Sequence, residues 1–212
     1  NEIDDYISLN GNSIIKIVDI GCAYGKLFSV INEKYNIKYL GVELNSKMVK
    51  SAKKEYDCYE NFEIICDSIE NHYNKLENAD IVVALETLEH IPGNIVPHII
   101  ENIALKKPKL FICSVPVEIG PSIWIKNLGS FLMGYSRYKE YTWTETFWAG
   151  FNKLGKLPTH NCGHKGFDWR WLEQSLRFCF NIRKKINFPF EFFPTFISPS
   201  VFFVLDSKLS NN

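Results

Sequence analysis

The chain has 212 residues, which suits one domain with an elaborated flank. Its 24 Lys and Arg side chains balance 24 Asp and Glu side chains, and a net charge of zero argues against a generic nucleic-acid-binding protein. A hydrophobic share of 46% and a charged share of 23% exclude a disordered chain and a coiled coil. The charge is nevertheless divided: residues 1–106 carry 10 basic and 17 acidic side chains, and residues 107–212 carry 14 and 7.

Short apolar runs alternate with helix-like segments in the first half of the chain. The runs predict strands at residues 14–20, 37–44, 62–66, 80–85 and 110–115. Apolar side chains recur at helical spacing between them, over residues 26–35, 46–56 and 94–105. This βαβα order predicts an α/β fold with a doubly wound, mostly parallel sheet that helices cover on both faces.

The pattern changes after the fifth predicted strand. Residues 117–160 are irregular and rich in aromatic and glycine residues, and so long a segment predicts an inserted cap or lid. Residues 123–132 carry an apolar stripe at helical spacing within it.

Regular structure returns near the end of the chain. Asp168 is a predicted N-cap for a helix over residues 169–177. Strands at 181–188 and 200–206 then complete a seven-stranded sheet. We therefore predict one domain from residues 1–116 and 161–212, interrupted by the cap.

Six cysteines lie at irregular spacing, which predicts free thiols rather than a disulfide framework. The first residues have neither a basic region nor an apolar region, so they do not resemble a secretory signal. These two features predict a cytoplasmic protein.

The most informative segment is Val18-Asp19-Ile20-Gly21-Cys22-Ala23-Tyr24-Gly25, between the first strand and the first helix. Small residues there allow the backbone to approach a ligand. The glycine spacing fits neither the dinucleotide fingerprint nor the Walker P-loop. A tight strand–helix turn without a ligand is the alternative.

Acidic residues follow the next three strands. Glu43 ends the second strand, where a carboxylate can accept hydrogen bonds from both hydroxyls of a ribose. Asp67 follows the third strand, and Glu86-Thr87-Leu88-Glu89-His90 follows the fourth. All of them lie at carboxyl ends of parallel strands, where open α/β sheets bind ligands.

These motifs together resemble the class I S-adenosylmethionine-dependent methyltransferases. The segment 19–25 is similar to that family's D-x-G-x-G-x-G loop, with Ala23 in place of the middle glycine. Glu43 resembles the ribose-binding acid and Asp67 the adenine-side acid. The run 86–92 resembles the E-x-L-E-H-x-P run of small-molecule members, and residues 163–167 resemble their late Gly-His loop.

The resemblance implies S-adenosylmethionine as the cofactor and a Rossmann-like fold. A cationic cofactor also suits the acidic first half. The residues that we expect to form its pocket are Asp19, Gly21, Cys22, Ala23, Tyr24, Gly25, Glu43, Leu44, Met48, Asp67, Ser68, Leu85 and Glu86.

Methyl transfer is an in-line displacement that an enzyme assists by positioning and by removing an acceptor proton. The candidate catalytic residues are His90, His164 and Glu89. A histidine has the pKa of a suitable general base. The alternatives are that Glu89 and His90 brace the following helix and that His164 is an ordinary loop residue.

A metal site is a further alternative, although we predict none. Glu86, Glu89, His90 and His164 form a two-carboxylate, two-imidazole set, similar to that of the small-RNA 2′-O-methyltransferases. Many small-molecule relatives carry the same run without a metal. The run His160-Asn161-Cys162-Gly163-His164 is weak evidence for zinc, because it has no second ligand pair.

The aromatic cap suggests the acceptor. Its aromatic rings and nearby basic residues suit a small or carrier-linked acceptor, and the basic residues would favour an anionic one. The alternative is that the aromatic residues form an apolar core of the cap itself. We expect no nucleic acid, and peripheral membrane contact through 117–160 is a second expectation. The leading hypothesis is methyl transfer, at oxygen; the alternatives are a non-catalytic cofactor-binding module for assembly or membrane docking, and metal-assisted RNA 2′-O-methylation.

Overall fold

The computed structural model describes residues 2–9, 13–132, 134, 141–157, 160 and 162–208. Seven strands form one sheet in the order β3-β2-β1-β4-β5-β7-β6. Their bounds are β1 Ile15–Ile20, β2 Ile37–Val42, β3 Phe62–Ile65, β4 Ile81–Leu85, β5 Leu110–Pro116, β6 Phe180–Phe188 and β7 Ser200–Ser207. Strands β1 to β5 are parallel, and β7 runs antiparallel to β5 and β6. The predicted seven-stranded, mostly parallel, Rossmann-like sheet is confirmed.

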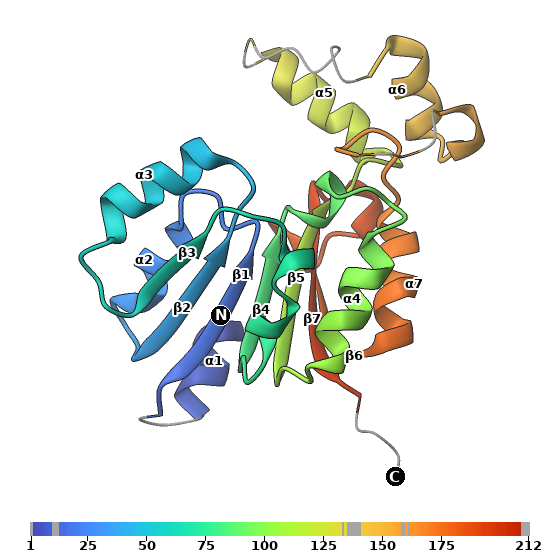
Figure 1. The fold of residues 1–212 in the computed structure, drawn as a ribbon. Coiled ribbons are helices and arrows are strands. Elements are labelled where there is room, and N and C mark those ends of the chain that lie inside the picture. Colours follow the sequence, from blue (N-terminus) through green and yellow to red (C-terminus); the bar gives the residue numbers. More distant parts are fainter. Residues whose placement is uncertain are drawn as a thin grey trace.

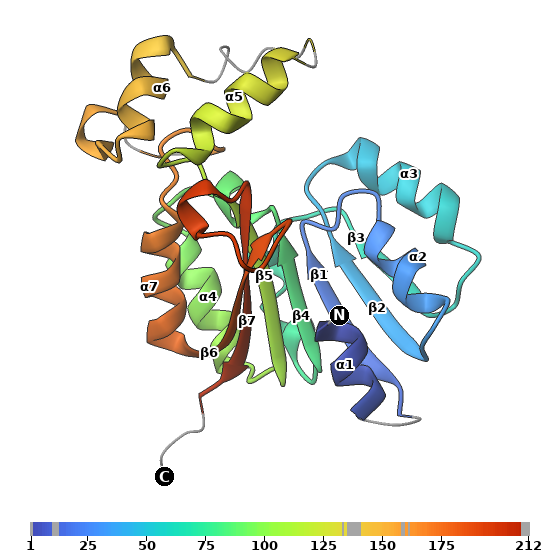
Figure 2. The same ribbon diagram turned by 180° about the vertical axis from the view of Figure 1, so that it is seen from behind.

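Helices cover both faces of the sheet (Figures 1 and 2). One face packs against α1 (Glu2–Leu9), α2 (Lys26–Asn32) and α3 (Ser46–Tyr56). The other packs against α4 (Val96–Leu105) and α7 (Trp169–Cys179). The sequence patterns did not predict α1, which buries Ile3 and Ile7 against the sheet.

Strand β5, which lies between β4 and β7 inside the sheet, contributes side chains to the cores on both faces. Every residue of β5 is buried. Leu110 and Ile112 belong to the core under α1 to α3, whereas Phe111, Cys113 and Val115 belong to the core under α4 and α7. A strand buried on both faces reads as a continuous apolar run, and this is the signal that predicted it.

In the described part of the cap, α5 (Ser122–Leu132) and α6 (Trp143–Gly150) project beyond the carboxyl edge of the parallel strands (Figures 1 and 2). The small core of the cap contains Ile123, Tyr141 and Ala149. Helix α5 coincides with the predicted stripe over residues 123–132, whereas α6 was not predicted. Thr142 begins α6 through a capping box with Glu145, which satisfies two backbone N–H groups.

Shorter elements complete the chain. The 3₁₀ helices are η1 Ile69–Asn71, η2 Tyr73–Leu76, η3 Leu88–His90, η5 Leu154–Lys156 and η6 Thr195–Ile197. Asp168 caps α7, as predicted, by accepting a hydrogen bond from the N–H of Arg170 at 2.9 Å. All six cysteines are free thiols. Among the described residues, no helix combines the length and apolar character needed to cross a bilayer.

Candidate active site

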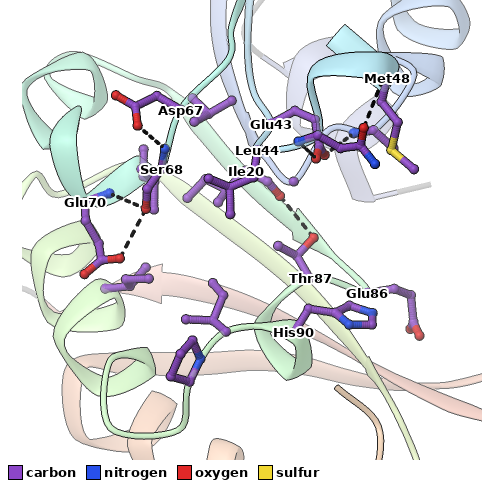
Figure 3. A pocket seen from close by; sticks show the side chains of 18 residues that line it. Ile20, Glu43, Leu44, Met48, Asp67, Ser68, Glu70, Glu86, Thr87 and His90 are labelled. Atoms are coloured by element: carbon purple, nitrogen blue, oxygen red, sulfur yellow. Dashed lines mark hydrogen bonds between the residues drawn. The ribbon is translucent and has the colours of Figure 1, made fainter. Parts of the chain in front are cut away.

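A cavity of about 500 Å³ opens where β1 to β4 end (Figure 3). This volume lies within the usual range for small-molecule sites. The walls come from the β1–α2 loop, the ends of β2 and β3, the β4–α4 connection and α4 itself. The lining residues are Ile20, Gly21, Ala23, Val42, Glu43, Leu44, Asn45, Met48, Asp67, Ser68, Ile69, Glu70, Glu86, Thr87, His90, Ile91, Pro92 and Ile99.

The β1–α2 loop turns through three residues in the left-handed region, Gly21, Ala23 and Gly25, at φ of +71°, +48° and +70°. A Cβ atom on Gly21 would lie 2.4 Å from the side chain of Thr87, so only glycine fits there. Ala23 adopts a conformation that costs an L-residue roughly 1–2 kcal/mol. The loop is therefore strained at the position where the family pattern has a glycine, and the strain lies at the cavity wall.

Glu43 joins two segments of the cavity wall. Its Oε2 accepts a hydrogen bond from the N–H of Ala23 at 3.0 Å, and its Oε1 accepts one from the N–H of Asn45 at 2.8 Å. Both oxygens keep lone pairs for a ligand, because a carboxylate oxygen has two. The carboxylate thus lies at the end of β2 with its position set by the backbone.

Asp67 is fixed in a similar way at the end of β3. It accepts hydrogen bonds from the backbone N–H of Ser68, the side-chain amide of Asn71 and the ring of His72. These donors hold the pKa of Asp67 below its usual value, so the group is ionised at neutral pH. The cavity therefore has a negative charge on its β3 side.

Asp19 and Cys22 lie beneath the loop rather than on the cavity wall. Asp19 is buried and accepts a hydrogen bond of 2.6 Å from the hydroxyl of Tyr39. Burial raises its pKa to about 7. The side chain of Cys22 fills the space beside Gly41, where a Cβ would lie 2.5 Å from its sulfur, and burial raises the pKa of this thiol. Both residues shape the loop from below.

Glu86 follows β4 at a φ of +48°, an unusual backbone conformation for a glutamate. Its N–H donates to the carbonyl and hydroxyl oxygens of Ser114, and the Ser114 hydroxyl lies 3.1 Å from Glu86 Oε1. Desolvation at the cavity wall raises the pKa of Glu86, opposed by the hydrogen bonds from Ser114 and Ser200. Figure 3 shows Glu86 next to Thr87, with its carboxylate pointing away from Glu43 and Asp67.

The late loop lies directly against η3. The N–H of Gly163 donates to the carbonyl of Glu89 at 2.7 Å, and the thiol of Cys162 donates to the carbonyl of His90 at 2.8 Å. The Tyr141 hydroxyl accepts from the N–H of Gly166 and donates to the carbonyl of His164. These bonds place the rings of His90 and His164 4.9 Å apart, edge to face.

Glu89, His90 and His164 form a compact group whose ligand atoms all lie within 4.8 Å of one another. The Glu89 carboxylate is fully buried, and neither oxygen has a hydrogen-bond partner among the described residues. Burial raises its pKa to about 8, and the neighbouring charges of Glu86 and Glu118 act in the same direction. A buried carboxylate without donors, beside two imidazoles, is a chemical environment that suits a divalent cation.

The structure brings most of the predicted residues together. The predicted residues that line the cavity are Gly21, Ala23, Glu43, Leu44, Met48, Asp67, Ser68, Glu86 and His90. Asp19, Cys22, Tyr24, Gly25 and Leu85 do not line it, and Glu89 and His164 lie behind His90. Of the four residues considered for a metal, Glu86 lies outside the compact group. The expectation that no metal is bound stays a prediction.

Sequence reasoning missed several lining residues. They are Ile20, Val42, Asn45, Ile69, Glu70, Thr87, Ile91, Pro92 and Ile99. Ile20 and Val42 are the last residues of β1 and β2, so their position at strand ends was a usable signal. Ile99 comes from the first turns of α4, and no pattern in the sequence places that helix beside the cavity.

Comparison with known proteins agrees with this geometry. Residues 17–105 match the model of a family described as a methyltransferase domain. The fold is similar to the methyltransferase domain of bacterial CtHen1-CN, with a TM-score of 0.62 and 16% identity over 97% of this chain and 95% of that one. No curated protein sequence matches the chain.

Two further solved structures share the fold. An S-adenosylmethionine-dependent methyltransferase from Clostridium acetobutylicum has a TM-score of 0.64 and 12% identity, over 96% of this chain and 88% of that one. Magnesium protoporphyrin IX methyltransferase from Synechocystis, with bound S-adenosylhomocysteine, has a TM-score of 0.57 and 17% identity, over 98% of this chain and 81% of that one.

Proposed function

We propose that this chain is a class I S-adenosylmethionine-dependent methyltransferase and that it transfers a methyl group to an oxygen atom of a small or carrier-linked acceptor. The observation that supports this most is the convergence of Glu43, Asp67 and Glu86 from three strand ends on one cavity beside the left-handed β1–α2 loop. Separate runs of the sequence supply these parts, and their meeting at one cavity is typical of a nucleoside-binding site.

The cavity residues fit S-adenosylmethionine chemically. When bound, this cofactor supplies an electrophilic methyl group on a positively charged sulfur. The ionised Asp67 and the neighbouring Glu43 favour a cation over a pyrophosphate. Glu43 would accept hydrogen bonds from the ribose hydroxyls, and Asp67 would lie on the adenine side. Gly21 would leave room for the backbone to approach the ligand.

A general base favours an oxygen acceptor, because a hydroxyl must lose its proton as the methyl group arrives. His90 lines the cavity, and its Nε2 lies 3.8 Å from Oε1 of the buried Glu89. This arrangement lets His90 take the proton from an acceptor hydroxyl, with the buried carboxyl group of Glu89 near the ring. The basic second half of the chain suits an anionic acceptor.

Calorimetric titration with S-adenosylmethionine and S-adenosylhomocysteine tests the cofactor assignment. We expect both to bind, and Glu43→Gln to weaken binding by at least about tenfold, since a charge-assisted hydrogen bond contributes about 1.5–3 kcal/mol. Glu60→Gln is the matched control, because Glu60 is exposed and precedes β3 at the opposite edge of the sheet. Binding of neither ligand, or equal affinities of both variants, would remove the proposal.

A second candidate function is metal-assisted methylation of an RNA 2′-hydroxyl. The compact group of Glu89, His90 and His164 favours it, because the Glu89 carboxylate is buried without a hydrogen-bond donor. These side chains would hold a divalent cation, which supplies Lewis acidity toward hydroxyl oxygens. The similarity of fold to the CtHen1-CN domain does not by itself assign the acceptor.

A chelator experiment separates the two candidates. The protein is stripped with a chelator and assayed with single-stranded RNA and S-adenosylmethionine, with and without added Mn²⁺. The metal-assisted function predicts activity that Mn²⁺ restores and that Glu89→Gln abolishes. Activity on a small hydroxyl compound that is insensitive to chelator would support the first candidate and contradict the second.

A further inference from the structure

Exposed apolar side chains gather at one end of the molecule. Among the described residues, 20 large hydrophobic side chains are exposed; nine of them lie in the cap and three in the β6–β7 connection. Single exposed hydrophobic residues are ordinary, but a contiguous group marks an interaction surface. The cap and the β6–β7 connection are neighbours, since Gly120 lies against Phe196. This end is also the edge at which the cavity opens (Figures 1 and 2).

Helix α5 contacts α6 through some of its residues and exposes other apolar residues. Trp124 donates through its indole N–H to the carbonyl of Thr146, and the Asn127 amide donates to the Thr146 hydroxyl, so these two residues lie against α6. Four further apolar side chains of this helix are exposed: Ile125, Leu128, Phe131 and Leu132. These exposed apolar residues of α5 therefore have no packing partner among the described residues.

Helix α6 continues the same kind of surface. Trp143, Phe147 and Phe151 follow one another at intervals of four residues, and all three are exposed. Trp143 has 83% of its surface accessible, although tryptophan is among the residues that gain most from burial. The rings of Phe147 and Phe151 pack against each other, with their centroids 4.9 Å apart. We call these three residues and the four exposed residues of α5 named above the cap face.

The charges around the cap face have one sign. The acidic residues of the described cap are neutralised, because Glu118 is buried against Lys126 at 3.0 Å and Glu145 pairs with Lys165 at 2.8 Å. Lys153 and Lys156 follow α6, are exposed, and form no ion pair with other described residues. The unpaired charge in the described part of this region is therefore positive.

We propose that the cap face docks the protein on a lipid bilayer that contains anionic lipids. Exposed aromatic and aliphatic side chains beside lysines match the two components of such a surface, an apolar interior and negative headgroups. A second copy of the chain fits less well, since an isologous contact would bring the lysines of both copies together. Docking turns the mouth of the cavity toward the bilayer, which gives access to acceptors dissolved in it.

Vesicle flotation tests the proposal with the full chain and without cofactor, so its outcome does not depend on the proposed methyl transfer. The vesicles contain phosphatidylcholine alone or an equimolar mixture with phosphatidylglycerol. We expect binding to the mixed vesicles and weaker binding to phosphatidylcholine alone. Absence of binding to the mixed vesicles would overturn the proposal.

Variants locate the surface. The double variant Phe131→Ser/Trp143→Ser is expected to raise the lipid concentration for half-maximal binding at least about tenfold, given the apolar area that each side chain buries. Phe178→Ser is the matched control, because Phe178 is 80% exposed at the end of α7, near the opposite edge of the sheet. Equal loss in both variants would overturn the assignment to the cap face.

The charge contribution has its own variant. Lys153→Glu/Lys156→Glu is expected to weaken binding to the mixed vesicles at least about fivefold and to leave the affinity for phosphatidylcholine unchanged. Sedimentation velocity without lipid tests whether a second copy of the chain, rather than a bilayer, covers the cap face. A dimer that the Phe131→Ser/Trp143→Ser variant dissociates would assign the cap face to a second copy and contradict the proposal.

Discussion

The two sides of the cavity are built in different ways. On the sheet side, Glu43 and Asp67 are each held by backbone N–H donors, and Gly21 fits tightly against Thr87. On the cap side, α5 and α6 share a core of only a few buried residues, and their outward faces stay exposed. The difference indicates that the sheet side is preorganised for its ligand. In the cap, by contrast, few of the apolar residues are used for packing within the cap itself.

The largest loss of stability is expected for a substitution at Gly21, which is closely packed against Thr87 on the sheet side of the cavity. Gly21→Ala places a Cβ 2.4 Å from Thr87 at a positive φ, so we expect a loss of about 2–5 kcal/mol in stability and loss of S-adenosylhomocysteine binding. Ala23→Gly is the matched variant in the same loop and should change stability by less than about 1 kcal/mol. Urea unfolding and calorimetry measure both. Similar losses in the two variants would contradict a loop fitted at Gly21.

The buried Asp19 should make stability depend on pH. Its folded pKa of about 7 lies above the value of an unfolded aspartate, so its contribution is fully present below about pH 4 and is lost as the pH rises through 7. The loss approaches about 1.4 kcal/mol for each unit by which the pKa is raised. Asp19→Asn keeps an acceptor for the Tyr39 hydroxyl and should flatten this dependence in urea unfolding at pH 5 and pH 8. If the unfolding free energy of the variant falls between pH 5 and pH 8 as much as that of the parent, Asp19 is not the cause of the pH dependence.

Gly150 allows a Cβ to be added at a closely packed position in the cap, away from the proposed cofactor site. A Cβ on Gly150 would lie 2.1 Å from the ring of Trp124, so Gly150→Ala should separate α5 from α6 at a cost of about 1–3 kcal/mol. Hydrogen exchange in α5 should rise, while S-adenosylhomocysteine binding stays unchanged. Gly155→Ala is the control, because a Cβ there meets nothing within 4 Å. Weaker cofactor binding in Gly150→Ala alone would show that the two sides are coupled.

The smallest predicted effect concerns the start of α6. Thr142→Ala removes the hydroxyl that accepts from the N–H of Glu145, and losing such a cap costs about 1 kcal/mol. Hydrogen exchange should become faster in α6 and stay the same in β4 and β5. Thr142→Ser keeps the hydroxyl and should leave exchange in α6 nearly unchanged. Faster exchange in β4 would mean that the cap supports the sheet.

The sheet side could be predicted from the sequence because its constraints are local. Strands buried on both faces appear as apolar runs, and a ligand at their carboxyl ends requires small or acidic residues at fixed places, as at Gly21, Glu43 and Asp67. The exceptions have a physical reason. Asp19 and Cys22 face the interior beneath the loop, and the sequence does not show which way a side chain points within a turn.

The cap could be predicted only in part. The stripe of α5 has helical spacing, but α6 is short and its residues are exposed, so its pattern does not separate a packed face from a solvated one. The approach of His164 to His90 depends on Cys162 and Gly163, which bond to carbonyl groups more than 70 residues earlier in the chain. Such long-range contacts leave no local signal.

The central claim is that the cavity at the ends of β1 to β4 holds S-adenosylmethionine. A crystal structure of the chain with S-adenosylhomocysteine tests it most directly. The account predicts the ribose hydroxyls at Glu43, the adenine beside Asp67 and the sulfur on the side of His90. Density for the ligand at another place, or a ribose that leaves Glu43 without contact, would contradict it.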